Sequence, residues 1–132
     1  MKMNLQAFYS PYFLGLTSLG LLAWLLPPSP VHVGIISLVG YALVEEIVFR
    51  WGLQYMLEGQ FSNRSIFLGI SWANVLTSLC FALMHAMYHP PLWALGTFFP
   101  SLIFGWVWTR YQSILPCWAI HWVYNVFYFY RV

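Results

Sequence analysis

The fold of this chain is decided by residues 33–57, VGIISLVGYALVEEIVFRWGLQYML. This stretch is long and apolar enough to cross a bilayer as a helix. It nevertheless carries two adjacent carboxylates, Glu45 and Glu46, and Arg50 follows four residues after the second. Ionised groups at that depth are costly, and they are retained where they pair with a partner or carry out a function. The segment therefore predicts a membrane-spanning helix that bears a polar functional site.

The whole chain has the composition of a membrane-embedded protein. Of its 132 residues, 61% are hydrophobic and 6% are charged. This length predicts a single transmembrane domain over residues 1–132. The net charge of +2 and the lack of a basic run argue against a nucleic acid partner. Membrane lipid is the expected surrounding.

Proline and polar clusters divide the chain into predicted spans. There are five, at about residues 7–26, 33–57, 66–88, 92–108 and 113–130. All five are predicted to be helices, because lipid offers no hydrogen-bond partners to open strand edges. The predicted fold class is therefore all-α: a polytopic transmembrane helix bundle of about five spanning helices, with a polar loop at 58–64.

The basic residues predict the orientation of this bundle. With five spans, Lys2, Arg64 and Arg110 fall on one side of the membrane and Arg131 on the other. Positively charged residues accumulate on the cytoplasmic side. We therefore expect an integral membrane protein whose N-terminus is cytoplasmic.

The second predicted span carries an acid–base pair. Glu46 and Arg50 are spaced i,i+4 with the acid first, which is the favourable direction on a helix. Glu45 is turned by about 100° from Glu46 on an α-helix. One glutamate can therefore neutralise Arg50 while the other points elsewhere.

The third and fifth predicted spans supply the remaining polar groups. His85 lies near the end of the third span, and His121 and Asn125 share one face of the fifth. A bundle buries such groups against one another, because facing lipid is costly. This predicts a cavity that contains a carboxylate, two imidazoles and an amide. A carboxylate or histidine can take a proton from water, and imidazole and amide N–H groups can stabilise an oxyanion. Together they suit amide hydrolysis without a covalent intermediate.

Each group taken alone also has a simpler interpretation. Glu46 and Arg50 can form a purely structural buried pair, His85 can be a packed histidine bonded to a carbonyl, and Asn125 can join two helices. A proton or ion pathway is another alternative, but it needs polar groups that reach both membrane surfaces. Here the polar groups are clustered.

Two other catalytic arrangements fit less well. Cys117, His121 and Asn125 suggest a cysteine protease, but one straight helix stacks them in a line and cannot fold them around one acyl carbon. Cys80 and Cys117 both lie in apolar stretches, where a thiol is usually a small buried hydrophobe. His85 and His89 have the spacing of zinc-binding helices, but no glutamate follows His85. No metal and no cofactor are therefore predicted.

Three motifs in this order resemble those of the CPBP family, the CAAX proteases and bacteriocin-processing enzymes, also called the ABI family. Residues 45–50 have the form EExxxR, residues 81–85 (Phe81 to His85) the form FxxxH, and residues 121–125 the form HxxxN. The resemblance covers about residues 41–128, which are the expected catalytic core. It implies a CAAX-protease-like helical core and a prokaryotic inner or plasma membrane location.

The resemblance also implies a glutamic-type intramembrane protease. Glu45 would be the general base, and His85 would help to hold or activate the water. His121 and Asn125 would form the oxyanion hole. Glu46, Arg50 and Phe81 would support the site. The implied partner is a protein or peptide substrate, including proteins with a C-terminal sorting tail. The alternative is a non-catalytic membrane protein of the same fold that binds a peptide or acts as an immunity or scaffold factor.

Overall fold

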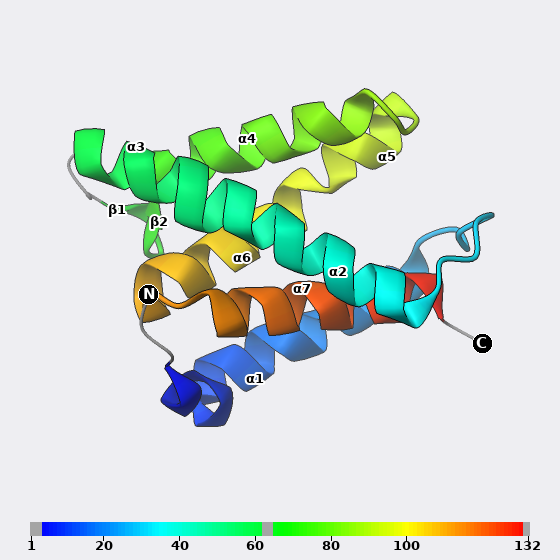
Figure 1. Cartoon of the computed structure of the whole chain (residues 1–132), viewed down its shortest axis with the longest axis horizontal. Helices are drawn as coiled ribbons and strands as arrows, with labels where there is room; N and C mark the ends of the chain where they lie inside the picture. Colours follow the sequence, from blue (N-terminus) through cyan, green and yellow to red (C-terminus); the bar gives the residue numbers. More distant parts are fainter. Residues whose placement is uncertain (1–3, 62–64, 131–132) are drawn as a thin grey trace.

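The computed structural model describes residues 4–61 and 65–130, and these residues are mainly helical (Figure 1). The predicted helical class is therefore correct in the main. In chain order the elements, with η marking 3₁₀- and π-helices, are η1 (Leu5–Tyr9), α1 (Pro11–Ser18), η2 (Leu19–Leu25), α2 (Ile35–Glu46), η3 (Ile47–Gln54), α3 (Tyr55–Gln60), β1 (Ser65–Phe67), β2 (Ile70–Ser71), α4 (Trp72–Ala86), α5 (Pro91–Gly96), α6 (Phe98–Tyr111) and α7 (Ile114–Phe129).

The first predicted helix is divided into three pieces. Ser10 is extended and Pro11 begins α1, so the 3₁₀-helix η1 is a separate element. Proline lacks the N–H that would continue a preceding helix, and it disfavours helical backbone in the residue before it. The chain then tightens into the 3₁₀-helix η2, which ends before Pro27 as predicted.

The second predicted helix begins at residue 35 and ends at residue 60, three residues later than expected, and it contains a π-helical segment. Helices α2, η3 and α3 follow one another without a break from residue 35 to residue 60. Residues 58–60 therefore belong to a helix, while residues 62–64 of the predicted polar loop lie outside the described residues. The π-helix η3 begins directly after Glu46 and includes Arg50. Such segments are rare and often lie at functional sites.

The prediction of helix is wrong for residues 66–71, because residues 65–71 form a two-stranded antiparallel hairpin. Leu68 and Gly69 make its turn, with φ of 49° and 82°. Positive φ at both central residues suits the twist of a tight hairpin. Trp106 Nε1 donates a hydrogen bond of 3.0 Å to the Leu68 carbonyl. Helix α4 starts only at Trp72.

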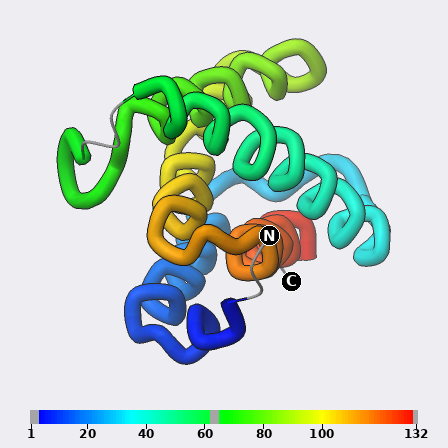
Figure 2. Tube along the Cα trace, turned by 60° about the vertical axis from the view of Figure 1, so that its left-hand side comes forward, coloured from blue at the N-terminus to red at the C-terminus, as the bar shows by residue number. Residues whose placement is uncertain are grey.

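Helix α6 lies between α4 and α7 in both views (Figures 1 and 2). Helix α2 crosses α7, η3 crosses α4, and η2 packs against α7. The hydrophobic core joins α1, α6 and α7 and consists of Phe13, Phe104, Val107, Trp108, Ile114, Cys117 and Ile120. This packing brings the middle of the long α2–η3–α3 helix against α4, α6 and α7.

One helix among the described residues, Pro91–Tyr111, is long and apolar enough to cross a membrane. It comprises α5 and α6. The apolar helices Pro11–Leu25 and Trp72–Ala86 are shorter. The five-span bundle therefore stays a prediction. The orientation does so too, because Lys2, Arg64 and Arg131 lie outside the described residues.

Candidate active site

Glu46 connects the long helix to the C-terminal helix. Its Oε2 accepts a hydrogen bond of 3.1 Å from Arg50 Nε, and its Oε1 lies 2.7 Å from His121 Nδ1. Glu46 and Arg50 are fully buried. A buried ion pair is tolerated when further hydrogen bonds satisfy its remaining atoms. Both oxygens of Glu46 are satisfied in this way.

His121 lies between the two glutamates. Its Nδ1 faces Glu46, and its Nε2 lies 3.7 Å from Glu45 Oε2. Since an ionised carboxylate only accepts hydrogen bonds, Nδ1 carries the proton that is donated to Glu46. The distances from His121 to the two glutamates differ, as expected for adjacent side chains that are turned by about 100° from each other on a helix. In the neutral ring, Nε2 is therefore left with a lone pair directed toward Glu45.

His85 approaches the same oxygen of Glu45 from α4. Its Nε2 lies 3.9 Å from Glu45 Oε2, and its Nδ1 lies 2.9 Å from the Phe81 carbonyl. A carbonyl accepts, so Nδ1 again carries the proton and Nε2 faces the carboxylate. Glu45 Oε2 itself is buried and has no hydrogen-bond partner among the described residues. Three atoms that can accept protons, Glu45 Oε2, His85 Nε2 and His121 Nε2, thus converge from α2, α4 and α7.

Aromatic rings hold the two histidines in place. Phe81 is buried, and its ring centroid lies 4.4 Å from that of His85 and 5.9 Å from that of His121. Phe104 of α6 stacks on His121 at 4.6 Å. Arg50 Cζ lies 5.9 Å from the centroid of the Phe81 ring. Phe81 therefore packs against two histidines and the arginine of the predicted site.

A second group of rings lies on the outer side of His85. The Trp93 ring is 6.0 Å from that of His85 and 4.5 Å from that of His89. Trp93 Nε1 donates a hydrogen bond of 2.8 Å to the Tyr128 hydroxyl, which joins α5 to α7. These contacts confine the His85 ring between α4, α5 and α7. His89 itself follows the end of α4 and is exposed, outside the helix.

Asn125 is not joined to the cluster by a hydrogen bond. It lies one turn after His121 on α7 and is half-buried, and its side chain has no such bond to any described residue. Cys117 lies one turn before His121, fully buried, with Sγ directed to the carbonyls of Ser113 and Phe104 at 3.3 and 3.7 Å. Its thiol therefore packs in the core. Cys80, expected to be buried, is exposed.

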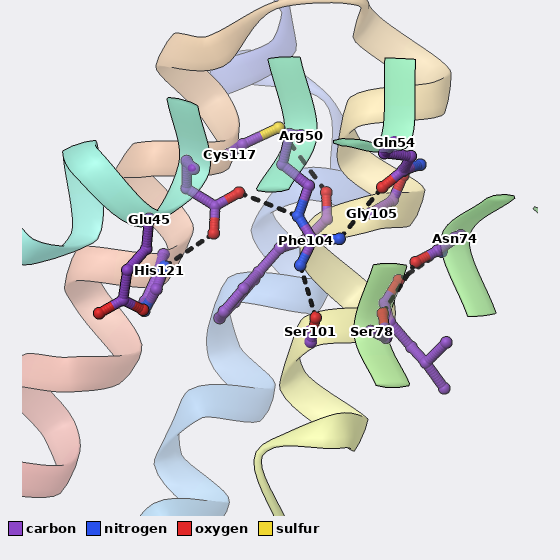
Figure 3. Close-up of polar contacts among 12 residues, drawn as sticks. Glu45, Arg50, Gln54, Asn74, Ser78, Ser101, Phe104, Gly105, Cys117 and His121 are labelled. Carbon is purple, nitrogen blue, oxygen red and sulfur yellow. Dashed lines mark hydrogen bonds and ion pairs between the residues drawn. The ribbon is translucent and has the colours of Figure 1, made fainter. Parts of the chain in front are cut away.

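Two residues that contact Arg50 of the site, Gln54 and Ser101, were not predicted from the sequence. Gln54 Oε1 accepts from Arg50 Nη1 at 3.0 Å, and Ser101 Oγ accepts from Arg50 Nη2 (Figure 3). Gln54 follows Arg50 by four residues, as Arg50 follows Glu46, so helical spacing could have revealed it. Ser101 comes from α6 and left no local signal.

No set of three His, Cys, Asp or Glu side chains in the described part of the chain is arranged to hold a metal ion. A depression of about 520 Å³ lies away from the convergent groups; its lining residues are Tyr55, Met56, Glu58, Gly59, Thr109 and Gln112. It contains none of the predicted site residues.

A family model described as "Type II CAAX prenyl endopeptidase Rce1-like" matches residues 27–127. The chain belongs to this family. The match includes all three motifs and therefore confirms the resemblance to the CAAX proteases. This Rce1-like membership indicates a protease of the CAAX type and an integral membrane protein. No curated protein and no solved structure matched the chain.

Proposed function

We propose that this chain is a glutamic-type intramembrane endopeptidase that hydrolyses a peptide bond in a membrane-associated protein tail or peptide. One observation carries the proposal: His85 Nε2 and His121 Nε2 both lie within 4 Å of Glu45 Oε2, in a chain of an endopeptidase family. These distances are too long for good direct hydrogen bonds. They suit groups that share a small polar molecule.

A water molecule at the usual 2.8 Å or so from Glu45 Oε2 can also reach a histidine Nε2. Both atoms accept hydrogen bonds in the tautomers described above, so each can take one of the water hydrogens. Glu45 then acts as the general base when the water oxygen attacks the peptide carbonyl. His85 holds and orients this water.

The tetrahedral intermediate carries a negative oxygen that needs hydrogen-bond donors. Asn125 is free to rotate toward a substrate because its amide has no hydrogen bond to a described residue. His121 supplies the second donor after Glu45 has passed the proton taken from water to its Nε2, and this proton then goes to the leaving amine. Glu46 and Arg50 maintain the charge and orientation of His121 and do not contact the substrate.

The substrate class follows from the family and from the expected location. A membrane-embedded site suits a protein tail that lies at the membrane, and the family name points to CAAX tails, in which the cysteine carries a prenyl group. In this proposal the five apolar segments span the membrane, with the N-terminus in the cytoplasm.

The test uses the purified full chain in liposomes with two fluorescent peptides that end in the same CAAX sequence, one farnesylated and one not. Mass spectrometry detects new peptide ends. We expect cleavage that does not require added metal and is lost in Glu45→Gln. Cleavage of both peptides would identify a general tail protease, and cleavage of the farnesylated one alone a prenyl-dependent enzyme.

A mixture of unmodified membrane-anchored peptides extends the test to other tails. If the folded wild-type chain binds these peptides but cuts none of them or the CAAX pair, the non-catalytic alternative is correct. Cleavage that stops with a chelator and returns with zinc would move the site to the metalloprotease class.

A further inference from the structure

Polar side chains at four-residue intervals form a continuous ladder along the long helix. The ladder consists of Glu46, Arg50, Gln54 and Glu58. Arg50 joins Glu46 at 3.1 Å and Gln54 at 3.0 Å, and Gln54 Nε2 reaches Glu58 Oε1 at 3.1 Å. On an α-helix each four-residue step turns by about 40°. The π-helical turns of η3 contain more residues, which opposes this drift and keeps the ladder on one face.

Helix α6 presents a complementary row to this ladder. Ser101, Gly105 and Thr109 also follow one another at four-residue intervals. Ser101 Oγ accepts from Arg50 Nη2 (Figure 3). The Gly105 carbonyl and Thr109 Oγ1 lie 3.0 and 3.1 Å from Gln54 Nε2. These residues are small, so the two helices approach closely enough for the ladder to bond across the interface.

The contacts of Gln54 fix the direction of its amide. A backbone carbonyl and a carboxylate face its Nε2, and both only accept hydrogen bonds, so the amide nitrogen must point to them. Its Oε1 therefore points to Arg50. Gln54 is fully buried, so no solvent competes for that bond.

Arg50 is consequently held at three points. Its Nε donates to Glu46, its Nη1 to Gln54 and its Nη2 to Ser101. A planar guanidinium with three fixed acceptors has one orientation. A guanidinium that is bonded to a carboxylate alone can rotate between a bidentate pair and a pair with a single hydrogen bond. Gln54 and Ser101 thus select the single hydrogen bond from Arg50 Nε, in which only Oε2 of Glu46 is used.

That geometry leaves Oε1 of Glu46 for His121. The 2.7 Å contact between Oε1 and His121 Nδ1 determines which ring nitrogen carries the proton and which faces Glu45. If Arg50 took both oxygens of Glu46, this contact would weaken and the tautomer of His121 would no longer be held.

We propose that Gln54 and Ser101 are positioning residues of the protease site. They orient Arg50, which orients Glu46, which in turn sets the tautomer of His121. Neither residue contacts the substrate. This inference rests on the proposed function for its catalytic consequence, but the predicted effect on His121 can be measured without any substrate.

The test compares two buried serines that each lose one hydroxyl. Ser101→Ala removes an acceptor from Arg50. Ser78→Ala, the matched control on α4, removes a bond to Asn74 Oδ1, which is not a ladder residue. Gln54→Leu removes the second acceptor at similar volume. The measurements are kcat and KM for whichever peptide the wild type cleaves, and the ¹⁵N NMR signals of the His121 ring nitrogens in detergent.

We expect kcat to fall about 10-fold or more in Ser101→Ala, with KM within about 2-fold of wild type, because only an interaction that acts in the transition state is weakened. The His121 ring signals should move toward a mixture of tautomers. Ser78→Ala should leave both the ring signals and kcat at wild-type values. Gln54→Leu should resemble Ser101→Ala, and if it does not fold, Ser101→Ala alone decides.

Wild-type ring signals in Ser101→Ala would overturn the proposal, and so would equal effects of the two serine variants. If the wild type cleaves no peptide but the His121 ring signals move as expected in Ser101→Ala, the positioning role of Ser101 is correct and the protease function fails.

Discussion

At the residue scale, the two adjacent glutamates make different contacts, so their replacement by glutamine should have different effects. Glu45 makes no direct hydrogen bond through Oε2, and Glu45→Gln should keep the fold while cleavage falls by about 10²-fold or more, the usual scale for the loss of a general base. Thermal melting beside a cleavage assay in one detergent measures both. Early melting of this variant would mean that Glu45 is structural.

Glu46→Gln should instead destabilise the protein. An amide can accept from Arg50 or from His121, but its NH₂ group then faces the other donor. Arg50 also becomes an uncompensated buried charge, which costs about 3–5 kcal/mol. We expect a lower melting temperature and lower activity together. If Glu46→Gln is fully stable but inactive, the roles of the two glutamates are reversed.

Cys117 tests the thiol alternative at the same scale. Its Sγ points to two backbone carbonyls in the core. Cys117→Ala should leave cleavage at the wild-type rate and cost about 1 kcal/mol through lost packing. The same paired assay applies. Abolished cleavage in a folded variant would restore the cysteine protease interpretation.

At the scale of elements, Gly105 decides how closely α6 approaches its neighbours. A Cβ at this position would lie 2.8 Å from Gln54 Oε1 and would overlap Asn74 Oδ1. Gly105→Ala should therefore cost about 1–3 kcal/mol, the range for overpacking in a core, and should lower activity by displacing Gln54.

Gly40 supplies the matched control, because a Cβ there meets no atom within 4 Å. Gly40→Ala lies within α2 and should stabilise the helix by up to about 1 kcal/mol. The melting temperatures of the two variants should move in opposite directions. If both melting temperatures moved in the same direction, the packing of Gly105 against Asn74 and Gln54 would be looser than described.

At the scale of the whole molecule, the N-terminal elements lie outside the residues matched to the family but are connected to the site through Tyr124 and Phe104. The Tyr124 hydroxyl donates a hydrogen bond of 2.6 Å to the Leu16 carbonyl, and its ring packs on Phe104 with centroids 5.3 Å apart. Phe104 in turn stacks on His121. The packing of α1 and η2 on α7 therefore continues to the catalytic histidine of the proposal.

Tyr124→Phe should weaken this connection by about 1 kcal/mol, the usual net contribution of one hydrogen bond. Hydrogen exchange should become faster in residues 11–25 while α4 stays unchanged. Tyr9→Phe is the control, since Tyr9 is 85% exposed. Equal exchange in both variants would show that the N-terminal elements are held by other contacts.

The sequence by itself determined the features that depend on the geometry of a single helix. The i,i+4 spacing of Glu46 and Arg50 follows from helix geometry alone, and so does the divergence of Glu45 from Glu46. The ordered motifs were sufficient to identify the family. The catalytic roles assigned to Glu45, His85, His121 and Asn125 stay predictions.

Only the tertiary structure decided how separate elements meet. Residues 65–71 form a hairpin whose turn at Leu68 depends on Trp106, a partner 38 residues away, so no local pattern could reveal it. The position of His121 between two glutamates depends on the packing of α7 against α2, and the orientation of Arg50 depends on Ser101 from α6. Helical periodicity is a local property, whereas contacts between helices depend on the shapes of all the side chains that fill the space between them.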